Sequence, residues 1–124
     1  MANKINKSNV PIDRFLRSDA EPNVLTFEID GQETTWEYRD LSWYEKNQCI
    51  AKATVIIPDK DGNTTFSFDP AIYYSEALLK MITAAPLPLT PQSIQNLRSE
   101  IGDRLVSIVP VPLDGGNRDE IKKD

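Results

Sequence analysis

Nine prolines in 124 residues limit where this chain can form regular structure. Proline has a fixed φ angle and no backbone N–H, so a helix accepts it in its first turn and otherwise ends before it. Asp69-Pro70 and Thr90-Pro91 each join a capping side chain to a proline, which predicts two helix starts. Pro86-Leu87-Pro88 ends the first of these helices, and Pro110-Val111-Pro112 ends the second.

The first of these helices is predicted to run from Ala71 to about Ala84. Helical spacing divides its residues into two faces. The inward face holds Tyr74, Leu78 and Ile82, with Ile72 and Leu79 on the flank. The outward face holds Tyr73, Glu76, Ala77 and Lys80.

The second helix carries one apolar stripe, and its five members lie three, four, four and three residues apart. They are Ile94, Leu97, Ile101, Leu105 and Ile108. Gly102 lies off this stripe. The stripe therefore predicts either one continuous helix or two pieces that are separated at Gly102.

A third, earlier helix is predicted from Trp43 to about Ala53, because Ser42 and Glu45 have the spacing of a capping box. In that motif each side chain accepts a hydrogen bond from the other residue's backbone N–H. Trp43, Ile50 and Ala53 are expected to face inward, and Tyr44 to face outward.

Alternating residues predict a β-hairpin before this helix, with Asp30-Gly31 suited to the positive φ of a tight turn. Its inward positions are Leu25, Phe27 and Ile29, then Trp36 and Tyr38. The turn is either a two-residue turn at Asp30-Gly31 or a longer loop. The longer loop is the alternative because Gln32 and Glu33 are poor strand formers.

Residues 55–57 and 64–68 predict a second hairpin around a turn at 59–63. The alternative is a helix that continues through Ile57 and stops before Pro58.

These elements predict an α+β fold with two short hairpins and three main helices. We expect a flexible arm over residues 1–11, a single α+β domain over 12–112 and a disordered, charged tail over 113–124. Ile12, Phe15 and Leu16 predict a helical turn that packs on the domain.

Composition excludes several classes of function. The chain has 14 basic and 19 acidic residues, a net charge of −5, which argues against binding to nucleic acid. No apolar run is long enough to span a membrane, and the first residues lack the apolar core of a secretory signal. Cys49 is the only cysteine, which favours a reducing cytoplasm.

The sequence offers no set of catalytic or metal-binding residues, so we expect neither an enzyme nor a cofactor. The chain has no histidine, which leaves Cys49 without an imidazole base. Residues 59–63 do not form an EF-hand loop, because the required glycine and glutamate positions hold Thr64 and Pro70. The carboxylate pairs lie in turn-like or tail-like segments, where water solvates both members.

Tyr44 and Tyr73 are the candidate partner-binding residues, because each falls on the expected outer face of a helix. Exposed aromatic side chains are enriched at protein interfaces. The alternative is that each ring lies flat over a neighbouring element.

The order of several motifs resembles the small tail assembly chaperones of long-tailed phages and prophages. The resemblance rests on Phe15-Leu16, on the segment WEYRDLS at 36–42 followed by Glu45, on Tyr73-Tyr74 with Leu78-Leu79, and on the stretch through Pro86 to Leu105. It covers about residues 15–109. The ending at 108–112 has no counterpart in the family pattern.

This resemblance implies a non-enzymatic assembly factor in the host cytoplasm that is absent from the mature virion. Its partners would be the tape-measure protein and, in addition, tail-tube subunits. A long tape-measure chain exposes apolar helical stripes that aggregate unless they are covered. The alternative reading is a structural tail completion or connector component. The resemblance implies no oligomeric state and no residue-level partner site.

Overall fold

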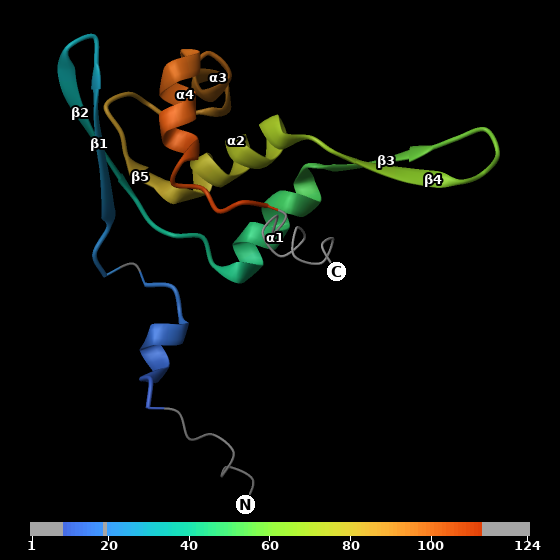
Figure 1. Cartoon of the computed structure of the whole chain (residues 1–124), viewed down its shortest axis with the longest axis horizontal. Coiled ribbons are helices and arrows are strands. Elements are labelled where there is room, and N and C mark those ends of the chain that lie inside the picture. Colours follow the sequence, from blue (N-terminus) through green and yellow to red (C-terminus); the bar gives the residue numbers. More distant parts are fainter. Residues whose placement is uncertain (1–8, 19, 113–124) are drawn as a thin grey trace, which may run out of the picture.

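A computed structural model describes residues 9–18 and 20–112 of the chain (Figure 1). The helical elements are η2 (Ile12–Phe15), α1 (Trp43–Lys52), α2 (Pro70–Met81), α3 (Pro91–Gln95) and α4 (Ser99–Val106). The strands are β1 (Asn23–Ile29), β2 (Gln32–Tyr38), β3 (Thr54–Pro58), β4 (Thr64–Phe68) and β5 (Ile82–Ala84). The predicted α+β class is confirmed. Most of the predicted arm at 1–11 and the whole tail at 113–124 lie outside the described residues.

β1 and β2 form the first predicted hairpin, with Ile29 paired to Gln32 across a two-residue turn. Asp30 and Gly31 have φ angles of 53° and 83°, the left-handed conformation that this dipeptide tolerates. The alternative of a longer loop was therefore wrong, because the turn chemistry outweighs the low strand propensity of Gln32 and Glu33.

The inward side chains of this hairpin form one end of the core. Phe27 and Trp36 are buried, and their rings stack with centroids 5.9 Å apart. Leu25, Ile29 and Tyr38 are half-buried beside them. The predicted inward face of both strands is thus confirmed.

The helix predicted to reach Ala84 ends earlier, at Met81. Residues 82–84 instead form β5, which pairs antiparallel with β2 and places Ile82 opposite Tyr38. The prediction of a longer helix was wrong because β2 offers an open strand edge to these β-branched residues. The resulting sheet has the order β1-β2-β5.

The face of α2 that meets the core also differs from the prediction. Leu78 is buried as expected, but its buried companions are Tyr73, Ala77 and Met81. α1, α3 and α4 all contact α2, so the helix is covered more widely than one stripe predicts. The prediction that Tyr73 and Ala77 face outward was wrong.

The segment that carries the last predicted apolar stripe forms two helices, α3 and α4, which are separated at residues 96–98. The prediction of a break at Gly102 was wrong, because Gly102 lies within α4. Asn96 ends α3, and Arg98 is extended with a φ of −62° and a ψ of 145°. The chain therefore turns between the helices while Leu105 still reaches the core, where it is fully buried.

β3 and β4 form the second predicted hairpin, which excludes a continuing helix through Ile57. Figure 1 shows this hairpin extending away from the helices and from the other sheet. Every residue in its two strands is exposed except Thr54 and Phe68 at the base. At that base, the Phe68 ring lies 5.9 Å from the Tyr73 ring.

Candidate partner-binding surface

The largest group of exposed aromatic side chains lies where the N-terminal segment approaches the start of α1. Phe15, Leu16, Trp43 and Tyr44 are each between 65% and 79% exposed. They line a groove of about 470 Å³, within the size range of binding clefts. The complete lining, here called the aromatic groove, is Arg14, Phe15, Leu16, Arg17, Asp40, Leu41, Ser42, Trp43 and Tyr44.

The capping box of α1 sets the direction of the two aromatic side chains. The Ser42 hydroxyl accepts a hydrogen bond from the Glu45 backbone N–H at 3.1 Å, and the Glu45 carboxylate accepts one from the Ser42 N–H at 3.0 Å. The helix therefore begins at Trp43. Trp43 and Tyr44 occupy the first turn, before the helix reaches its packing partner, and project into solvent.

Glu45 also connects the two segments that line the groove, residues 14–17 and residues 40–44. Its carboxylate accepts two hydrogen bonds from the Arg39 guanidinium, at 3.1 and 3.2 Å. It forms an ion pair with Arg17 of the N-terminal segment, 3.5 Å between Nε and Oε1. The hydrogen bonds from Arg39, supported by the Ser42 N–H, lower the pKa of Glu45 to about 2. Glu45 is therefore ionised at neutral pH and holds Leu16 near the start of α1 through the adjacent Arg17.

The structure separates the two candidate residues. Tyr44 is 65% exposed and lies in the aromatic groove, where its role in partner binding stays a prediction. Tyr73 is fully buried, so its assignment as an exposed contact residue was wrong. Its hydroxyl donates a 2.7 Å hydrogen bond to the Pro110 carbonyl, and burial raises the pKa of Tyr73 to about 12.

Sequence reasoning missed three of the four exposed groove residues. Trp43 was expected to face inward, but it is 79% exposed at the first position of α1. Phe15 and Leu16 were expected to pack on the domain as part of a helical turn. The turn forms as η2, but none of its residues is buried, so the packing prediction was wrong. The sequence signal that could have revealed this surface was the position of Trp43 next to Tyr44, which was expected to face outward.

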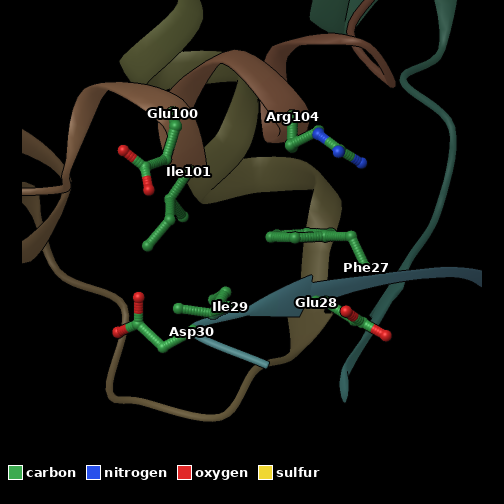
Figure 2. Close-up of a pocket in the computed structure, with 7 residues that line it drawn as sticks. All are labelled: Phe27, Glu28, Ile29, Asp30, Glu100, Ile101 and Arg104. Atoms are coloured by element: carbon green, nitrogen blue, oxygen red, sulfur yellow. The ribbon is translucent and has the colours of Figure 1, made fainter. Parts of the chain in front are cut away.

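A second cavity lies between the β1–β2 turn and α4 (Figure 2). It has a volume of about 210 Å³, and its lining includes Phe27, Asp30, Glu100 and Arg104. Arg104 lies over the Phe27 ring, 5.6 Å from the centroid. At the rim, Arg98 pairs with both Asp30 and Glu100. These charged groups satisfy one another and hold the turn against α4, which indicates a structural role.

A third, mostly apolar groove of about 460 Å³ separates α2 from α3 and α4. Tyr74, Leu78 and Leu97 contribute to its lining. All three side chains are buried or half-buried, whereas Phe15, Leu16, Trp43 and Tyr44 in the aromatic groove are exposed.

The described residues contain no group of three His, Cys, Asp or Glu side chains that are placed to hold a metal ion. Cys49 is fully buried, and this burial raises the pKa of its thiol. No helix in residues 9–18 and 20–112 has the length and apolar content that crossing a membrane requires.

Comparisons with protein-family models, with curated proteins and with solved structures find no match to this chain.

Proposed function

We propose that this chain is a non-enzymatic assembly factor that covers apolar surface on another polypeptide. The observation that carries this proposal is the aromatic groove, where Phe15, Leu16, Trp43 and Tyr44 are each at least 65% exposed. Exposed apolar surface of this kind is costly in water and marks sites of protein contact. Trp and Tyr are also the side chains most enriched among residues that dominate binding energy.

The shape and composition of the groove favour an apolar helix as its ligand. The groove is lined by two separate segments, residues 14–17 and residues 40–44. An amphipathic helix places large side chains at i, i+3, i+4 and i+7 and buries them in such a groove. The net charge of −5 keeps the chain soluble while this surface is uncovered.

We further propose, from the resemblance to tail assembly chaperones, that the helix belongs to a phage tape-measure protein. The chain would bind it in the host cytoplasm, assist the addition of tail-tube subunits, and be absent from the mature virion. The groove contains Phe15-Leu16 and Leu41-Ser42, which belong to the motifs that carry the resemblance.

The test is binding of the purified protein to overlapping segments of phage tape-measure proteins. We expect Trp43→Ala and Tyr44→Ala to weaken binding by about tenfold or more, because each truncates an exposed aromatic contact. Val24→Ala is the matched control, since Val24 is 58% exposed but lies on β1 outside the groove.

Failure of every tape-measure segment to bind would contradict the assignment of the partner. Equal loss of binding in the Val24→Ala control would contradict the assignment of the groove. Mass spectrometry of purified particles gives a further check. Stoichiometric amounts of the chain in mature particles would favour a structural tail component instead.

A further inference from the structure

The β3–β4 hairpin is a second exposed surface, distinct from the aromatic groove. Val55, Ile56, Ile57 and Phe66 are between 45% and 70% exposed. Isolated two-stranded hairpins are marginally stable in water, and three or more strands with an apolar face are needed for independent stability. Within the described residues this sheet contains β3 and β4 alone, so each strand has an edge with no strand beside it.

The two outer edges of the hairpin differ. β3 ends in Pro58, which lacks an N–H and disfavours pairing at that end. β4 reads TTFSF and contains no charge, no proline and no glycine. Natural proteins protect open strand edges with such residues, and β1, the other long outer strand, carries Glu28. The edge of β4 is therefore the one left open for strand addition.

Charge indicates which partner this edge suits. The chain carries a net charge of −5, so two copies repel each other at long range. In the hairpin, the charged residues are confined to the turn, at Asp59, Lys60 and Asp61. The strand residues can face their own counterparts without like-charge repulsion, which is the requirement for a two-fold contact.

We propose that two copies of this chain pair through β4, antiparallel about a two-fold axis at Phe66. Thr65 of one copy then lies opposite Ser67 of the second copy, a hydroxyl pair that favours cross-strand contact. Phe66 lies opposite Phe66 of the second copy.

The pairing also completes an apolar row. Ile56 and Phe66 are cross-strand partners in the hairpin and therefore lie on the same face. The two-fold axis joins the Ile56–Phe66 pairs of both copies into one row across four strands. A four-stranded sheet is no longer subject to the marginal stability of a two-stranded hairpin. The pairing leaves the aromatic groove available. The dimer therefore extends beyond the proposed function and does not depend on it.

The first test measures the molar mass of the pure wild-type chain by light scattering and sedimentation across the micromolar range. We expect a dimer, twice the 14.0 kDa of one chain. Phe66→Lys places like charges opposite each other and should weaken dimerisation by at least about tenfold. Trp43→Lys is the matched control, because Trp43 is similarly exposed but lies in the aromatic groove; its mass should equal that of the wild type.

The second test is disulfide trapping, which reports the register directly. Phe66→Cys should crosslink two copies, because residues that face each other across antiparallel strands have Cα atoms within disulfide range. Ile56→Cys should not crosslink, because its counterpart lies three strand spacings away, about 14 Å. The native Cys49 is buried and supplies a low background.

A monomeric wild-type chain throughout the concentration range would overturn the proposal. So would a dimer that Phe66→Lys leaves intact, or one that Ile56→Cys traps and Phe66→Cys does not. These measurements use the chain without any partner, so failure of dimerisation leaves the tape-measure assignment standing. Failure of tape-measure binding likewise leaves the dimer standing.

Discussion

The Tyr73 hydroxyl donates a 2.7 Å hydrogen bond to the backbone carbonyl of Pro110, which lies 37 residues further along the chain. Tyr73 projects from α2, and Pro110 follows α4. The bond therefore holds the segment after α4 against the core, next to the buried Val109. It satisfies a phenol that would otherwise be buried without a partner, which is why the core accepts a tyrosine at this position.

Removal of this hydroxyl should destabilise the fold. Tyr73→Phe keeps the ring but leaves the Pro110 carbonyl without its donor, and we expect a loss of about 1–2 kcal/mol in the free energy of unfolding. Urea denaturation measures it. Tyr44→Phe is the control, because Tyr44 is exposed and should change stability by less than about 0.5 kcal/mol. Equal effects at the two positions would contradict the role of the bond.

The same residue predicts a decline in stability at alkaline pH. Burial raises the pKa of Tyr73 from 10.0 to about 12, so the folded state holds this proton more tightly than the unfolded state does. This contribution is fully present below pH 10 and is lost as the pH rises from 10 towards 12. Unfolding free energies across that range should fall in the wild type and fall less in Tyr73→Phe. Parallel pH profiles for the two proteins would count against it.

Glu45 predicts that the folded state loses stability at acidic pH. The Arg39 hydrogen bonds lower its folded pKa from 4.5 to about 2, so the ionised form stabilises the folded state above pH 4.5. As the pH falls from 4.5 towards 2, this contribution is lost. We expect it to be on the order of 1–2 kcal/mol, because the carboxylate is bidentate to Arg39 yet partly exposed.

Glu45→Gln isolates this contribution from the titration of other carboxylates. The variant should be less stable than the wild type at pH 7, and the difference between them should shrink as the pH falls below 4.5. Glu33→Gln is the control, because Glu33 is exposed on β2 and takes part in no ion pair among the described side chains. A difference that stays constant with pH would show that Glu45 acts through packing alone.

Local chemistry explains which elements could be predicted from the sequence. The Asp30-Gly31 turn, the Ser42–Glu45 capping box and the Asp69-Pro70 start each depend on neighbouring residues, and each was confirmed. β5, which depends on a distant partner, was not predicted. Ile82 and Thr83 favour a strand, but the neighbouring sequence does not show that β2 lies beside them.

The candidate site shows the same limit. Tyr44 and Tyr73 have equivalent patterns in the sequence, yet one is exposed and the other is fully buried. The difference is that α2 contacts α1, α3 and α4, whereas the first turn of α1 leaves Trp43 and Tyr44 exposed. A single helical stripe assumes one buried face, so it cannot distinguish these two cases.

The two tryptophans provide the sharpest contrast between core and surface. Trp36 is 1% exposed, stacks on Phe27 and donates a 3.1 Å hydrogen bond from its indole N–H to the Thr34 hydroxyl. Trp43 is 79% exposed in the aromatic groove. Trp36→Ala should therefore cost about 3–5 kcal/mol, a large part of the stability of a small domain, whereas Trp43→Ala should change it by less than about 0.5 kcal/mol.

Fluorescence distinguishes these two environments without loss of the fold. In Trp43→Phe the remaining indole is Trp36, which should emit at short wavelength and resist quenching by iodide. In Trp36→Phe the remaining Trp43 should emit at long wavelength and be quenched readily, unless a partner covers the groove. Protection of Trp43 on addition of a tape-measure segment, with no change at Trp36, is the result that the proposed groove requires. Equal quenching of the two single-tryptophan proteins would contradict the assignment of core and surface.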